Sequence, residues 1–207
     1  MKKVFFIDFD GTITTTDVCN AMTQTYARQG WEEINRRWEN KEISTAECAN
    51  QTFALFNTNP EQLKAFVMNM EIDPYFAEFC RWCRQKSYPI YILSDGYDFN
   101  IRIILDKYQL NIPYYANRLV YNGKFHIECP HLNLDCGHCG TCKTSLMESL
   151  KEENSLAVYI GDGYSDTCPA KHADMVFAKD RLYSYCMEHG IPAREFSDFS
   201  HILASLE

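Results

Sequence analysis

Three short apolar segments of the chain each end in a polar, glycine-containing turn: residues 8–12 (DFDGT), 94–96 (SDG) and 161–163 (GDG). Aspartates in such turns can bind a hard cation, attack an electrophile or transfer a proton. Asp8 and Asp10 are two residues apart, so an extended backbone places both carboxylates on one side. These residue types predict chemistry on an anionic group such as phosphate.

A cation is expected where these carboxylates meet. Asp8, Asp10 and Asp162 would repel one another at one place unless they shared a metal ion. Ligands that are all oxygen favour a hard ion, and Mg²⁺ fits best. Mg²⁺ can neutralise a phosphate while one carboxylate attacks phosphorus, and a second can protonate the leaving oxygen and then deprotonate water. The sequence therefore predicts a magnesium-assisted phosphoryl transfer.

Phosphate oxygens need further partners. Ser94, with the N–H groups of its turn (Asp95 included), is the candidate in the second turn. The missing positive charge is assigned to Lys143, which begins a predicted helix just before the third apolar segment. Lys151 and Lys171 are its rivals, and any of the three could be a solvated helix residue.

The elements that position these turns follow from hydrophobic periodicity. Residues 3–7, 89–93 and 156–160 are predicted to be buried strands. Helical spacing prevails over residues 17–68, and later helices alternate with strands; the glycine turn at 122–123 predicts a hairpin. This pattern predicts an α/β fold: a doubly wound parallel sheet with helices on both faces, whose strand ends bring the three turns to one edge.

The long helical stretch divides the chain. We expect a core of residues 1–14 and 73–207, and a helical cap inserted at residues 15–72. The stripe of Trp31, Ile34 and Trp38 is interpreted as the apolar core of that cap.

The order of the motifs resembles that of the haloacid dehalogenase superfamily of phosphohydrolases. Asp8-x-Asp10-Gly-Thr, then Ser94, then Lys143, then Gly161-Asp162-Gly163-x-x-Asp166 is similar to its four motifs. The resemblance implies a Rossmann-like core and an inserted cap. About 20 matching residues span most of the chain, and their combination is far more specific than any single motif.

The resemblance also implies roles for individual residues. Asp8 would be the nucleophile that forms an aspartyl-phosphate, and Asp10 the general acid and base. Mg²⁺ would be held by the Asp8 carboxylate, the Asp10 main-chain carbonyl and the Asp162 carboxylate. Ser94 and Lys143 would bind phosphate, and Asp166 would orient metal-bound water or Lys143.

Two branches of the superfamily look close. One is the phosphoserine phosphatase branch. The other includes the diketo-methylthiopentyl phosphate phosphatase and the phosphoethanolamine/phosphocholine phosphatases, to which the stretch ILSDGYDF at 92–99 and the cysteine-rich run into Lys143 are similar. We favour the second group without naming a substrate.

Residues outside these motifs leave alternatives open. Asp17 could cap a helix or, as the phosphoserine phosphatase resemblance implies, contact a substrate amine. Arg28, Arg36 and Arg37 could meet a substrate carboxylate, although such residues more often form a solvated helix face.

A cysteine-rich segment at 129–142 carries Cys136, Cys139 and Cys142 at C-x₂-C spacing, with two histidines nearby. This spacing is compatible with a structural Zn²⁺ site, for which four nitrogen or sulfur ligands are needed. Free thiols in a substrate-facing loop, or an oxidised pair, are the competing readings.

Composition excludes several partners. The net charge of −8 and the lack of a Lys/Arg run argue against nucleic acid and against anionic membrane surfaces. No apolar stretch approaches the roughly 20 residues that a bilayer span requires. The apolar start is interrupted by Asp8 too early for a signal peptide, so a cytoplasmic protein with reduced thiols is expected.

These observations together predict a Mg²⁺-dependent phosphatase for a small phosphorylated metabolite. A phosphomutase or phosphotransferase would share every residue named for catalysis, and only its products would differ. A non-catalytic phosphate-ligand sensor or a zinc-linked binding module is the alternative from another class. The sequence leaves the oligomeric state open.

Overall fold

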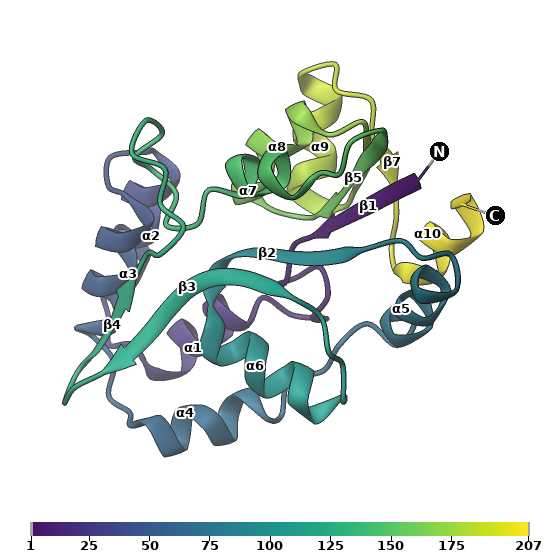
Figure 1. Cartoon of the computed structure of the whole chain (residues 1–207). Coiled ribbons are helices and arrows are strands. Elements are labelled where there is room, and N and C mark those ends of the chain that lie inside the picture. Colours follow the sequence, from purple (N-terminus) through teal and green to yellow (C-terminus); the bar gives the residue numbers. More distant parts are fainter. Residues whose placement is uncertain (1, 207) are drawn as a thin grey trace.

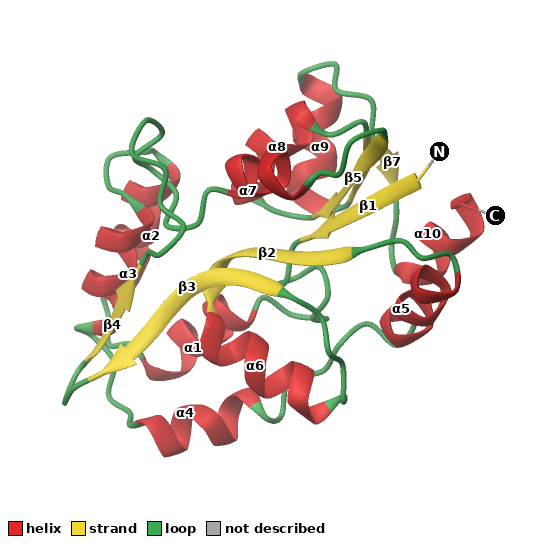
Figure 2. Ribbon diagram, in the orientation of Figure 1, coloured by secondary structure: helices red, strands yellow, loops and turns green. Residues whose placement is uncertain are grey.

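The computed structural model describes residues 2–206, which form one seven-stranded sheet with the order β4-β3-β2-β1-β5-β6-β7. Six strands are parallel, and β4 alone pairs antiparallel, with β3. Figure 2 shows the strands in the middle of the molecule with helices around them. The strands are β1 (Lys2–Ile7), β2 (Ile90–Tyr97), β3 (Tyr114–Tyr121), β4 (Phe125–Glu128), β5 (Ser155–Gly161), β6 (Met175–Ala178) and β7 (Arg194–Glu195).

Helices of the described chain alternate with these strands. They are α1 (Val18–Tyr26), α2 (Trp31–Glu39), α3 (Thr45–Phe53), α4 (Pro60–Val67), α5 (Phe76–Gln85), α6 (Asp98–Lys107), α7 (Lys143–Leu150), α8 (Thr167–His172), α9 (Asp180–Glu188) and α10 (Phe199–Leu206), with a short 3₁₀ turn η1 (Tyr164–Asp166). The predicted doubly wound α/β fold is therefore confirmed. None of the helices within residues 2–206 is long and apolar enough to cross a bilayer.

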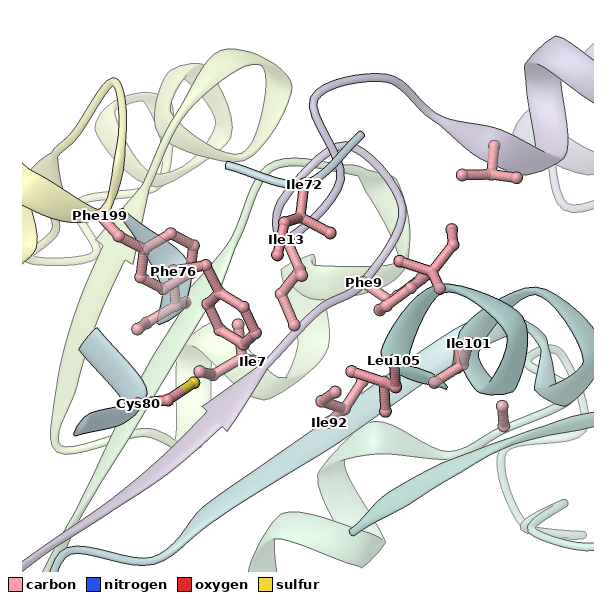
Figure 3. Close-up of a cluster of buried hydrophobic side chains, with 14 of the residues drawn as sticks. Ile7, Phe9, Ile13, Ile72, Phe76, Cys80, Ile92, Ile101, Leu105 and Phe199 are labelled. Atoms are coloured by element: carbon pink, nitrogen blue, oxygen red, sulfur yellow. The ribbon is translucent and has the colours of Figure 1, made fainter. Parts of the chain in front are cut away.

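The sheet is built around β1, which lies between β2 and β5 and is buried on both sides. This position explains its continuous apolar run, because a central parallel strand has no solvated face. Odd-numbered residues such as Phe5 and Ile7 face α5, α6 and α10, and Figure 3 shows Ile7 within this cluster. Even-numbered residues such as Phe6 face α7 on the other side.

The helical stretch predicted at residues 17–68 forms α1 to α4, which lie between β1 and α5 in the chain. Side-chain caps set the starts of three of them: Asp17 for α1, Ser44 with Glu47 as a capping box for α3, and Asn59 before Pro60 for α4. In Figure 1, α2 and α3 lie beside β4 and the cysteine-rich segment. The insertion thus sits next to the edge of the sheet where the predicted turns should meet.

The structure differs from the sequence reading at a few elements. The second strand does not end at 93, because β2 continues through Ser94 to Tyr97 with a register shift against β3. The helix α5 begins only at Phe76, since Asp73 accepts the N–H of Tyr75 and holds that segment as a turn. The closing β7 and α10 had no clear periodic signal.

Candidate active site

Asp8 follows directly on β1, and its position is fixed from the neighbouring strand. Its N–H donates to the carbonyl of Ile160 on β5 at 2.9 Å. One carboxylate oxygen of Asp8 accepts a 2.5 Å hydrogen bond from the ammonium group of Lys143, at the first position of α7. The structure therefore brings together two groups that are 135 residues apart in the sequence.

Lys143 is enclosed by its partners. Besides Asp8, its Nζ donates to Asp166 Oδ1 at 2.6 Å and to Ser165 Oγ at 2.9 Å. Burial alone would lower the pKa of Lys143, but the carboxylates of Asp166 and Asp8 raise it above the usual lysine value. The ammonium group consequently stays charged next to Asp8.

The carboxylate of Asp166 accepts four hydrogen bonds, which fix its position. Tyr159 donates its hydroxyl to Oδ1 at 2.6 Å, and the N–H groups of Gly163 and Asp162 donate to Oδ2 at 2.9 and 3.1 Å. Lys143 supplies the fourth hydrogen bond. Since both oxygens are occupied, Asp166 is suited to orienting Lys143 rather than to binding a ligand itself.

Asp162 lies across from Asp8, at the end of β5. Thr12 donates to Asp162 Oδ1 at 2.5 Å. Gly11 has a positive φ of 80°, and a Cβ there would fall 2.6 Å from Asp162 Oδ2. The turn after β1 therefore needs glycine both for its backbone conformation and for the approach of Asp162.

Asp10 and Ser94 form the other side of the site. Ser94 Oγ lies 3.5 Å from Asp10 Oδ2 and accepts the N–H of Gly96 at 2.9 Å. Cys19 contacts the same Asp10 oxygen at 3.6 Å, while Asp10 Oδ1 is buried and has no hydrogen-bond partner among the described residues. Burial and the nearby Asp17 raise the pKa of Asp10 to about 7.

These carboxylates suit a hard divalent cation. Side-chain oxygens of Asp8, Asp162 and Asp166 lie within 4.8 Å of one another, and only Asp166 has both of its oxygens occupied. Burial and the charge of Asp166 raise the pKa of Asp8 well above its usual value and that of Asp162 to about 6. Such crowding, with oxygen donors alone, is relieved by an ion such as Mg²⁺.

Asp95 is placed differently from Ser94. Its Oδ1 accepts the N–H of Thr141 at 2.8 Å and the side-chain amide of Asn117 at 3.2 Å, and its Oδ2 accepts Thr45 Oγ1 at 2.8 Å. What it can still offer a phosphate is its main-chain N–H. The carboxylate itself ties α3, β3 and the cysteine-rich segment to the end of β2.

This tie gives a prediction for Thr45, whose hydroxyl donates to Asp95 and accepts Trp38 Nε1 at 3.0 Å. Thr45→Val keeps the shape but removes the hydrogen bonds that Asp95 Oδ2 and Trp38 Nε1 make to the hydroxyl. The free energy of unfolding should fall by about 1–2 kcal/mol in urea titrations. Thr25→Val, at an exposed position of α1, should change it by less than about 0.5 kcal/mol. Equal effects of the two substitutions would contradict the structural importance of this tie.

A cavity of about 390 Å³ opens above these residues. Asp8, Asp10, Ser94 and Asp162 line it together with residues from α1, α2 and α3. The interpretation of the tryptophan stripe as cap core is wrong: no residue of α2 is fully buried, and Trp31 and Trp38 line the cavity instead of filling an interior.

Asp17 caps α1, as one of its two interpretations expects, while its contact with a substrate amine stays a prediction. Its carboxylate accepts the N–H of Asn20 at 2.8 Å and caps α1, and the same residue lines the cavity. The three candidate arginines do not reach this space. Arg36 pairs with Glu33 and Arg37 lies near Glu42 on the outside of α2, and Arg28 is absent from the described lining.

The geometry does not support zinc in the cysteine-rich segment. In residues 2–206, the clusters of three or more possible metal ligands are Asp8/Asp162/Asp166 and Asp10/Asp17/Cys19. Cys136, Cys139 and Cys142 are free thiols of different exposure, and they are not part of such a cluster. The C-x₂-C spacing was the only signal for zinc, and the structure does not gather these thiols into a set of metal ligands.

Sequence reasoning missed several residues of the site. Tyr159 lies in an apolar strand, where the sequence pattern indicates only a core residue. Thr12 lies within the first motif and Ser165 within the last, and the sequence assigned neither of them a function. Trp38 has the periodic spacing of a buried helix face, but it lines the cavity instead of packing in a cap core.

Comparisons with known proteins agree with this geometry. The profile of the family described as haloacid dehalogenase-like hydrolase matches residues 5–171. A 2-hydroxy-3-keto-5-methylthiopentenyl-1-phosphate phosphatase of Bacillus pumilus (strain SAFR-032) is 32% identical over 211 residues, covering 100% of this chain and 91% of the relative.

Solved structures share the fold. A phosphoserine phosphatase from T. onnurineus, in complex with NDSB-201, superposes with a TM-score of 0.72 at 18% identity, covering 99% of this chain and 94% of its own. A phosphoserine phosphohydrolase-like protein from Francisella tularensis subsp. tularensis SCHU S4 reaches 0.73 at 20% identity, covering 99% of both chains.

With its fold, its motifs and its match over most of the length, the chain belongs to the haloacid dehalogenase-like hydrolase family. Within that family it is a phosphatase, a hydrolase of phosphoric monoesters.

Proposed function

We propose that this protein is a Mg²⁺-dependent phosphatase that hydrolyses a small phosphomonoester through an aspartyl-phosphate on Asp8. The observation that carries the proposal is the arrangement around Asp8. One of its oxygens is held by the buried Lys143, and its side chain lines the same cavity as Asp10, Ser94 and Asp162. A carboxylate fixed in this way is a preorganised nucleophile.

In the first step, a carboxylate oxygen of Asp8 forms a bond to phosphorus as the bond to the substrate alcohol breaks. Asp10 donates a proton to the leaving oxygen. In the second step Asp10 takes a proton from water, whose oxygen attacks phosphorus and releases inorganic phosphate, restoring Asp8. Ser94, the N–H groups around it and Lys143 hold the phosphate oxygens.

Magnesium has a natural place in this scheme. The carboxylates of Asp8 and Asp162 and the main-chain carbonyl of Asp10 would hold it. When bound, Mg²⁺ neutralises the charge of the phosphate and lets a carboxylate approach it. Asp166 would keep Lys143 and the backbone of the last motif in position.

The requirement for the ion can be measured by chelation. Phosphate release should fall to background in excess EDTA and return when Mg²⁺ is added beyond the chelator. Ca²⁺, which prefers more ligands and longer bonds, should restore much less. Full activity after exhaustive chelation, with metal analysis confirming removal, would contradict the magnesium assignment.

We further propose that residues 15–72 act as a cap that limits substrates to small ones. The helices α1 to α3 form one wall of the cavity, which supports this division of the chain. The methylthiopentenyl phosphate ester named for the Bacillus relative is the first substrate to test. We propose that the substrate is a small phosphorylated metabolite. Given the cysteine content, we also propose that the protein is cytoplasmic.

Product analysis separates this function from phosphoryl transfer to a second metabolite. A phosphatase releases one inorganic phosphate for each ester consumed. An isomerised ester or a newly phosphorylated acceptor, with little free phosphate, would indicate a mutase or transferase instead.

A further inference from the structure

The charged residues that line the cavity, besides those proposed for catalysis and metal binding, are mostly acidic. They include Asp17, which lies next to Asp10, and also Glu39 and Asp180. Among the described lining residues the single basic side chain is Arg181, on α9. The alcohol half of a substrate whose phosphate is held near Asp8 would share the cavity with these groups.

Arg181 is already paired. Its NH1 donates to Glu39 Oε1 at 2.7 Å, so a residue of the inserted helix α2 neutralises a cation of the core. Arg36 pairs with Glu33 on the outside of α2. The Arg181–Glu39 pair carries no net charge, so a negatively charged alcohol half would find no free cation in the described lining and two further carboxylates, those of Asp17 and Asp180.

The lining also contains aromatic side chains. Trp38 and Tyr164 pack edge to face, with ring centroids 5.4 Å apart, and Trp31 lines the cavity beside them. Rings of this kind favour apolar groups, and their negative faces attract cations rather than anions.

We infer that the cavity selects phosphomonoesters whose alcohol half carries no negative charge, and that Glu39 determines this selectivity by neutralising Arg181. The inference rests on the proposed phosphatase function and adds the charge class of the substrate. Carboxylate-bearing esters are excluded by repulsion from Asp17 and Asp180, which no free cation of the described lining offsets once Glu39 has neutralised Arg181.

Three esters of matched size test this: phosphoethanolamine (cationic), ethylene glycol monophosphate (neutral) and phosphoglycolate (anionic). At low ionic strength with saturating Mg²⁺, kcat/KM for phosphoglycolate should be at least about tenfold below that of the neutral ester. Competition of each ester against p-nitrophenyl phosphate gives an independent inhibition constant in the same order. Equal values for the anionic and neutral esters would overturn the inference.

Two substitutions separate charge from structure. Glu39→Gln and Arg181→Gln both break the contact between α2 and α9, so a purely structural role would shift the phosphoglycolate/neutral ratio in the same direction. The charge argument expects opposite shifts of about three- to tenfold: a rise for Glu39→Gln, which frees a cation, and a fall for Arg181→Gln. Shifts in the same direction would overturn the role of Glu39.

Glu33→Gln is the matched control, because Glu33 lies on the same helix, pairs with Arg36 and is not part of the described lining. It should leave the ratio unchanged. If none of the esters nor p-nitrophenyl phosphate were hydrolysed, the proposed function would fail and the inference with it. Hydrolysis without charge discrimination would remove the inference alone.

Discussion

Asp8→Asn should reduce phosphate release by at least about 10⁴-fold while the protein remains folded. The amide has nearly the same shape as the carboxylate but is a very poor nucleophile. It also cannot provide the negative oxygen that a divalent ion needs. Steady-state phosphate release with saturating Mg²⁺ measures the loss, and circular dichroism with thermal unfolding checks the fold.

Asp106→Asn is a suitable control, because Asp106 is exposed on α6, away from the cavity lining. Its activity should equal that of the unmodified protein. Asp8→Ala excludes the possibility that slow deamidation of an asparagine restores the carboxylate. Appreciable Mg²⁺-dependent turnover by the alanine variant would refute Asp8 as the nucleophile.

Lys143→Met should damage both stability and activity. The methionine leaves Asp8 and Asp166 buried without the cation that now lies 2.5 and 2.6 Å from them. Removing one partner of a buried charge pair typically costs about 3–5 kcal/mol of stability. Activity should fall at least about 10³-fold, since phosphate loses a fixed positive partner. Denaturant titration and phosphate release measure the two losses separately.

Lys151→Met provides the comparison at the C-terminal cap of the same helix. Lys151 follows α7 and pairs with Asp174 at 2.7 Å, with about a third of each side chain exposed. Exposed pairs contribute little, so the stability should change by less than about 1 kcal/mol and the activity not at all. If Lys143→Met were as stable and as active as Lys151→Met, the buried charge pair would have no function.

The sheet could be predicted because its signals are local. The run before Asp8 is apolar on both faces, as a central strand requires, and the turn at Gly123 joins β3 to β4 as expected. Parallel strands then bring the turns containing Asp8, Ser94 and Asp162 to one edge. The position of Lys143 followed from motif order.

What escaped prediction depends on how turns fold back and on long-range packing. Tyr159 donates to Asp166, seven residues further on, because the turn after β5 folds back toward the strand. The carboxylate of Asp95 binds Thr45 and Thr141, which are 50 residues before it and 46 after it. No periodic pattern marks such partners. The tryptophans of α2 had the period of a buried stripe, and only the fold shows that a cavity lies beneath them.

The central claim is that Asp8 itself carries the phosphoryl group during turnover. The direct measurement is to quench the Mg²⁺-loaded enzyme in the steady state, reduce the acyl phosphate with borohydride and locate the modified residue by peptide mass spectrometry. The account predicts that homoserine replaces aspartate at position 8 only when substrate is present, and that no such product forms in the Asp8→Asn variant. Rapid turnover with an unmodified Asp8, or reduction at another aspartate, would contradict it.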